Sequence, residues 1–77
     1  MIHIYYFAGL KDVTGKSEEM LDCQQMTVSE LKKWAVETYP GFASYSVHVA
    51  VNEEYALDSD VISQGDTVAF IPPVSGG

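Results

Sequence analysis

Thr67-Val68-Ala69-Phe70-Ile71-Pro72-Pro73-Val74-Ser75-Gly76-Gly77 combines a strand pattern with an abrupt stop. Residues 67–71 are β-branched or apolar, which is typical of a strand. The two prolines have no N–H group to give to a sheet and fix φ, so the strand should end at Ile71. Consecutive prolines favour an extended backbone, and six residues can span about 20 Å. We therefore expect a domain over residues 1–71 and a projecting tail over residues 72–77.

The end of this tail has properties that suit a reactive group. Two glycines carry no side chain that would collide with a narrow slot in another protein. A frayed terminus is the plain alternative, but a frayed end does not need a stiff pair of prolines before it. A C-terminal carboxylate is ionised at neutral pH and is a poor electrophile until it is activated, for instance as a mixed anhydride with AMP. The tail is therefore compatible with an activatable carrier.

Upstream of the tail, the chain alternates between strand patterns and one helix. Strand patterns of β-branched, aromatic or alternating apolar residues cover four segments, 2–7, 17–23, 47–52 and 55–57. The helix should begin after Thr27, because Thr27 and Glu30 have the spacing of a capping box. Tyr39-Pro40-Gly41 should end it. Residues 8–15 are expected to form a loop with one helical turn, and residues 58–64 to be irregular.

One helix and four or five strands pack most economically as two layers. We predict an α+β domain with a mixed four- to five-stranded sheet and one main helix on one face. The first and last strands can then be central neighbours. The helix would cover inward side chains at alternate strand positions: Ile2, Ile4, Val49, Val51, Val68 and Phe70.

Composition limits the partners of this 77-residue chain. Its formal charge is −7, from eleven acidic residues against four lysines. Nucleic acids and anionic membranes are poor partners for such a surface, whereas a basic protein is a good match. One cysteine excludes an intrachain disulfide, and no apolar leader or membrane span is visible, so we expect a cytoplasmic protein.

The usual catalytic and metal sites are missing from the sequence. There is no glycine-rich phosphate loop, and one cysteine with two histidines makes no metal cluster. Cys23 is interpreted as a packed strand cysteine rather than a nucleophile. His3 and His48 should be outward strand positions. We therefore expect no metal and no cofactor bound by this chain.

Several motifs together resemble a known family, the small sulfur-carrier subunits of molybdopterin synthase. The similar segments are Phe7-Ala8-Gly9-Leu10-Lys11-Asp12, Thr27-Val28, Val51-Asn52, Gly65-Asp66, Val68-Ala69-Phe70 and, above all, Pro72-Pro73-Val74-Ser75-Gly76-Gly77. The resemblance runs over essentially the whole chain. Lys11 stands where an arginine is expected and Ile71 where an aromatic is common, but neither departure touches the tail.

The resemblance implies a β-grasp, ubiquitin-like fold and a sulfur-carrying cycle. An adenylating enzyme would use ATP on Gly77, and a sulfur donor protein would then convert the carboxylate to a thiocarboxylate. Pro72, Pro73, Val74, Ser75 and Gly76 would enter the large synthase subunit, where the sulfur passes to a cyclic pyranopterin precursor. The chain itself would be non-catalytic, in an assembly of two small and two large subunits.

Other functions share the same tail chemistry. The chain could carry sulfur for another pathway, such as thiamin thiazole formation, or be a ubiquitin-like protein modifier. It could also be a plain interaction domain whose Gly-Gly is incidental.

A partner-binding patch follows from the expected fold. The sheet face opposite the helix would display Phe7 and Ile71 near the root of the tail, with Tyr55 beside them. Exposed aromatics grouped on a small acidic protein are favoured interface anchors. The alternative is that Phe7 and Ile71 complete a second minor core.

Overall fold

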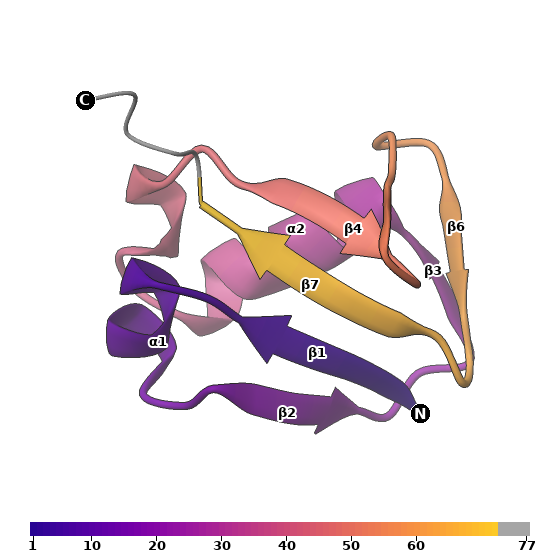
Figure 1. Cartoon of the computed structure of the whole chain (residues 1–77), viewed down its shortest axis with the longest axis horizontal. Coiled ribbons are helices and arrows are strands. Elements are labelled where there is room, and N and C mark those ends of the chain that lie inside the picture. The colour runs from indigo at the N-terminus through magenta and orange to yellow at the C-terminus, as the bar shows by residue number, and fades with distance from the viewer. Residues whose placement is uncertain (73–77) are drawn as a thin grey trace.

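The computed structural model describes residues 1–72. Outside the described residues lie Pro73, Val74, Ser75, Gly76 and the expected reactive residue Gly77. Figure 1 shows the order of elements, which are β1 (Ile2–Tyr6), α1 (Gly9–Thr14), β2 (Glu18–Leu21), β3 (Gln25–Thr27), α2 (Val28–Thr38), the 3-10 turn η1 (Phe42–Ser44), β4 (His48–Val51), β5 (Glu54–Tyr55), β6 (Val61–Ser63) and β7 (Thr67–Ile71).

The main sheet has five strands in the order β2-β1-β7-β4-β5. β1 and β7 are parallel, and the other pairings in this sheet are antiparallel. α2 crosses one face of the sheet (Figure 1). The predicted α+β class, the mixed sheet and the single main helix are confirmed, as is the central pairing of the first and last strands.

The core lies between the sheet and α2. Strand alternation sends every second side chain inward, which is why β1 and β7 each bury a regular series. The buried cluster consists of Ile2, Ile4, Tyr6, Leu10, Val28, Leu31, Ala35, Phe42, Val49, Ile62, Val68 and Phe70. Each large apolar side chain contributes about 1.5–3 kcal/mol on burial. This one-sided core leaves the other sheet face available for function.

α2 begins with the predicted capping box. The Glu30 backbone N–H donates to Thr27 Oγ1 at 3.1 Å, and the Thr27 N–H donates to Glu30 Oε1 at 2.8 Å. These bonds satisfy two of the backbone donors that a helix start leaves free. At the other end the Tyr39 N–H donates to the Ala35 carbonyl, and the following Pro40 prevents continuation.

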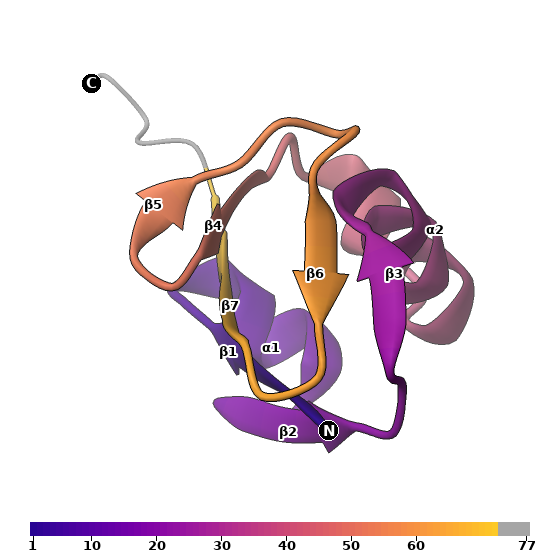
Figure 2. The ribbon, with the colours of Figure 1, turned by 90° about the vertical axis from the view of Figure 1, so that its right-hand side faces the viewer.

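The expectation that residues 58–64 are irregular is wrong for residues 61–63, which form β6. β6 pairs with β3 in a separate two-stranded antiparallel sheet, and Ile62 in its centre is fully buried. The paired residues of β3 and β6 are far apart in the sequence, so no local pattern predicts their pairing. The pair closes the core at the start of α2, because β3 runs directly into that helix (Figure 2).

Two smaller expectations also need correction. Residues 8–15 are mostly helical, since α1 covers Gly9–Thr14 and the Thr14 hydroxyl donates to the Leu10 carbonyl at 3.0 Å. Cys23 lies in the connection between β2 and β3 rather than in a strand. In this connection its side chain is half-buried against the core. Its thiol donates to the Gln25 carbonyl at 3.4 Å.

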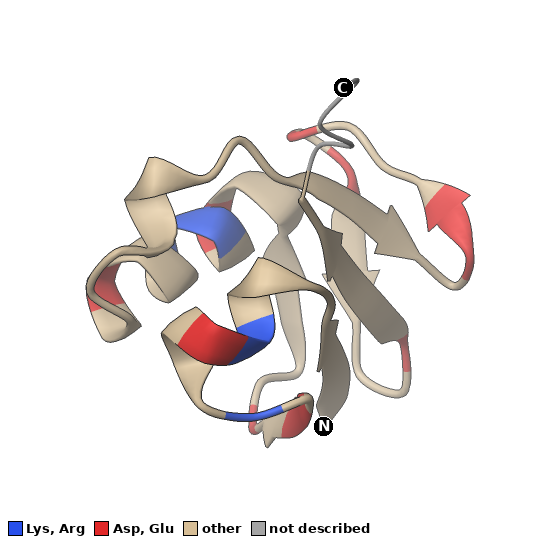
Figure 3. Cartoon of the chain, turned by 60° about the vertical axis from the view of Figure 1, so that its left-hand side comes forward, with Lys and Arg blue, Asp and Glu red and all other residues tan. Residues whose placement is uncertain are grey.

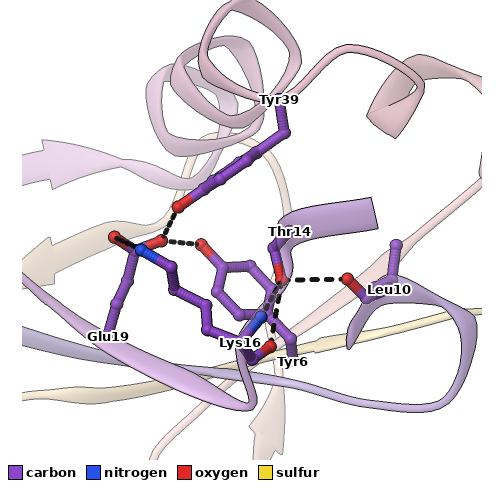
Figure 4. Close-up of polar contacts among 6 residues, drawn as sticks. All are labelled: Tyr6, Leu10, Thr14, Lys16, Glu19 and Tyr39. Carbon is purple, nitrogen blue, oxygen red and sulfur yellow. Dashed lines mark hydrogen bonds and ion pairs between the residues drawn. The ribbon is translucent and has the colours of Figure 1, made fainter. Parts of the chain in front are cut away.

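A polar cluster ties α2 to the β1–β2 hairpin (Figure 4). The Tyr6 hydroxyl donates to Glu19 Oε1 at 2.5 Å, and the Tyr39 hydroxyl donates to the same oxygen. Lys16 Nζ lies 3.6 Å from the other carboxylate oxygen. Burial, and then the bond to Glu19, raise the pKa of Tyr6, so its hydroxyl stays protonated as the donor. The cluster holds the Tyr6 ring, which stacks on Phe70 in β7.

Candidate functional site: the outer face of the sheet

The sheet face turned away from α2 is called the outer face here. Strand register places Tyr5, Ala69, Ala50 and Tyr55 in one row across β1, β7, β4 and β5. This row has no charged side chain and contains two alanines between two tyrosines. A surface that is apolar at its centre suits a protein interface better than open solvent.

Phe7, Tyr55 and Ile71, the three residues predicted for the partner-binding patch, all lie on the outer face. Phe7 is 46% exposed and Tyr55 76% exposed, while Ile71 is half-buried. Tyr6 pairs with Phe70, so Phe7 and Ile71 follow matched positions on neighbouring parallel strands. The role of the three residues in binding stays a prediction.

His48, which was expected to point outward but was not included in the predicted patch, connects two of these residues. It pairs with Ile71 across β4 and β7, and its ring meets the Tyr55 ring edge-on at a centroid distance of 5.8 Å. Pro72, the first residue of the predicted tail, follows Ile71 directly and is half-buried. The tail therefore starts at the end of β7 that carries Ile71, beside His48 on β4. The other tail residues lie outside the described part of the chain.

A shallow recess of about 250 Å³ opens on the outer face. It is lined by Tyr5, Phe7, Ala50, Glu53, Thr67 and Ala69. The recess could not be predicted from the sequence, because nothing in the spacing of Ala50 and Ala69 shows that these two small residues pair across β4 and β7. The recess extends the apolar surface from Phe7 towards the β4–β5 turn.

Charges are unevenly distributed around this face. The lysines lie on α1, on the loop after it and on α2, whereas Glu53 lies in the β4–β5 turn and Glu54 begins β5 (Figure 3). On β1, His3 Nε2 lies 2.9 Å from a carboxylate oxygen of Glu18. Acidic side chains therefore lie at both ends of the apolar row, Glu18 beside Tyr5 and Glu54 beside Tyr55, which favours a partner with basic residues.

Asn52 anchors the β4–β5 turn to the β6–β7 turn. Its side-chain amide N–H donates to Asp66 Oδ1 at 3.1 Å, and its side-chain carbonyl accepts from the Thr67 N–H at 3.0 Å. The Ser63 backbone N–H donates to the other Asp66 oxygen at 2.8 Å. The Ser63 bond, and then the Asn52 bond, hold the pKa of Asp66 below its ordinary value. These contacts explain why Asn52 and Asp66 occur at two of the motif positions.

Within residues 1–72, no group of three or more histidine, cysteine or acidic side chains is arranged to hold a metal ion. Among the same residues, no helix has the length and apolar character needed to cross a membrane.

Comparison with known proteins places the chain in a family. The model of the ThiS family matches residues 4–77. The chain belongs to the ThiS family. The human molybdopterin synthase sulfur carrier subunit is 35% identical over 83 residues, covering 99% of this chain and 93% of that protein. The subunit of the same name from Phaeosphaeria nodorum is 38% identical over 85 residues, covering 96% and 88%.

Solved structures share the fold of this ThiS-family chain. The crystal structure of SAMP1 from Haloferax volcanii has a TM-score of 0.82 at 28% identity, over 99% of this chain and 98% of that one. A putative molybdopterin converting factor subunit 1 from Pyrococcus furiosus has a TM-score of 0.84 at 24% identity, over 95% and 97%. The complex of subunits 1 and 2 of the molybdopterin-converting factor from Helicobacter pylori contains a chain with a TM-score of 0.70 at 18% identity, over 99% and 97%. The predicted β-grasp, ubiquitin-like fold is confirmed.

Proposed function

We propose that this chain is the sulfur carrier subunit of a molybdopterin synthase in the cytoplasm. The observation that carries the proposal is the similarity to curated proteins of that name, which extends over 96–99% of this chain. The chain would be a non-catalytic subunit without a bound cofactor, because its chemistry resides in a terminal carboxylate on which other proteins act.

The reaction centres on Gly77. An adenylating enzyme would join the Gly77 carboxylate to AMP, releasing pyrophosphate from ATP. A sulfide equivalent from a sulfur donor protein would then displace AMP and leave a thiocarboxylate. Glycine suits this displacement, since it lacks a side chain that would obstruct the attacking sulfur.

The large synthase subunit would receive the tail and the outer face together. Residues 72–77 would lead the thiocarboxylate into that subunit's active site, where sulfur passes to the cyclic pyranopterin precursor. Phe7, Tyr55 and Ile71 would supply the apolar contacts at the root of the tail. The assembly would contain two small and two large subunits.

A tail variant tests this function without disturbing the fold. One residue added after Gly77, or deletion of Gly76 and Gly77, should abolish sulfur transfer to the precursor. The melting temperature should stay unchanged because the core of residues 1–71 is intact. Full product formation by the extended chain would remove Gly77 from the mechanism.

A second candidate function is attachment to other proteins. It is favoured by the 28% identity to SAMP1, whose full name is small archaeal modifier protein 1. The two functions differ in their products. A carrier copurifies from native lysate with the large synthase subunit, whereas a modifier forms isopeptide bonds between Gly77 and lysines of target proteins. Peptide mass spectrometry of the copurified material separates them.

A further inference from the structure

The outer-face recess has an apolar floor and aromatic sides. Ala50 and Ala69 pair with each other on β4 and β7, and Ala50 is only 7% exposed, so these two residues form the floor. Tyr5, which pairs with Ala69, and Phe7 line one side. Methyl groups below and ring surfaces beside them favour an aliphatic chain over a polar group.

The size of the recess points to a side chain rather than a free ligand. Its volume of about 250 Å³ lies below the range of about 300–1,000 Å³ that is usual for small-molecule pockets. It is also part of the surface that carries the exposed Phe7 and Tyr55, so a partner docked there would cover it.

Glu53 lines the recess from an unusual backbone position. Asn52 and Glu53 form a two-residue turn between β4 and β5 with φ angles of 51° and 71°. Both angles are left-handed, as in a type I′ hairpin turn, whose second position is commonly glycine. Glutamate in this conformation costs free energy that glycine would avoid. Figure 2 shows the β4–β5 hairpin bending to the side of the sheet away from α2. The strained position thus brings a carboxylate to the outer face.

We propose that the recess receives an arginine side chain from the protein that docks on the outer face. The aliphatic stem would lie on Ala50 and Ala69, and the guanidinium would lie against the rings of Tyr5 or Phe7. Glu53 would accept its N–H groups as a charge-assisted pair. The formal charge of −7 favours a cationic partner over an anionic one. This inference rests on the proposed function, in which the docking protein is the large synthase subunit.

The test is calorimetric binding of the complete chain to the large subunit at low salt. Glu53→Gln keeps the shape of the side chain and removes its charge, and should weaken binding about tenfold. Glu54→Gln is the matched control, because Glu54 is adjacent but lines a different cavity. Its affinity should change by less than about twofold.

Two further variants separate binding from stability. Glu53→Gly relieves the backbone strain at this left-handed position. This variant should therefore melt at a higher temperature than the unaltered chain and still bind the large subunit more weakly. Ala69→Leu fills the recess and should also weaken binding. Because a charge pair is screened by salt, the affinity of the unaltered chain should fall more steeply with ionic strength than that of Glu53→Gln.

The outcomes distinguish the inference from the proposed function. If the unaltered chain binds and both Glu53→Gln and Ala69→Leu bind equally well, the recess takes no arginine, while the carrier function stands. If the affinities of the unaltered chain and of Glu53→Gln depend equally on salt concentration, Glu53 does not pair with a cation of the partner. If the unaltered chain does not bind the large subunit, both the function and the inference fail.

Discussion

Phe7 follows β1 directly and leaves nearly half of its side chain exposed on the outer face. We predict that Phe7→Ala weakens binding to the large subunit by about 2 kcal/mol or more, the scale of an interface hot spot. The same change should cost the isolated domain less than the 3–5 kcal/mol typical of a buried phenylalanine. Calorimetric binding and thermal melts measure the two effects.

Phe70 is the matched control for Phe7. It lies on the adjacent strand but is fully buried, where it stacks on Tyr6. Phe70→Ala should therefore destabilise the domain by about 3–5 kcal/mol. Normal affinity combined with a collapsed melting temperature in Phe7→Ala would place Phe7 in a second core and remove it from the patch.

Glu19 gives the domain a specific sensitivity to acid. Burial alone would raise its pKa, but the hydrogen bonds from Tyr39 and Tyr6, with the charge of Lys16, lower it below the ordinary value. A carboxyl with a lowered folded-state pKa stabilises the fold above its unfolded pKa of about 4.3, and this contribution is lost as pH falls through the folded-state pKa.

We predict that Glu19→Gln lowers the free energy of unfolding by about 2 kcal/mol at neutral pH, because hydrogen bonds to a charged acceptor are the stronger kind. The difference from the unaltered chain should shrink as the pH falls below about 4. Urea unfolding at several pH values measures it. Glu37→Gln, an exposed change on α2, is the control. A difference that stays constant with pH would exclude the proposed role of the Glu19 charge.

At the scale of elements, α2 depends on its first turn. Thr27→Ala removes the acceptor for the Glu30 N–H and should cost about 1 kcal/mol. Ser29→Ala, two residues on and exposed, should cost much less. Chemical unfolding of both variants makes the comparison. Equal losses would mean that the capping bond does not stabilise the helix.

Local patterns predicted the elements whose signals are contained in a few residues. The capping box located α2, and alternation located β1, β4 and β7. The β3–β6 pair was missed because three-residue strands have little pattern of their own, and their pairing depends on contacts across the whole fold. α1 was underestimated because six residues are too few to show helical periodicity.

At the scale of the whole molecule, topology assembles a surface that sequence spacing could not define. Phe7 and Ile71 come from opposite ends of the chain and occupy corresponding positions because β1 and β7 are parallel neighbours. The aromatic patch could be proposed from strand alternation, since outward aromatics are conspicuous. The recess could not, because its floor is made of two alanines and its carboxylate depends on the conformation of one turn.

Sulfur loading of Gly77 can be measured as the intact mass of the chain after incubation with ATP, its adenylating enzyme and a sulfur source. We expect a mass increase equal to the exchange of one oxygen for sulfur, dependent on ATP and located at Gly77 by fragmentation. A chain lacking Gly76 and Gly77 should show no increase. An unchanged mass in the complete chain, or sulfur found only on Cys23, would contradict the claim that this protein carries sulfur on its C-terminal carboxylate.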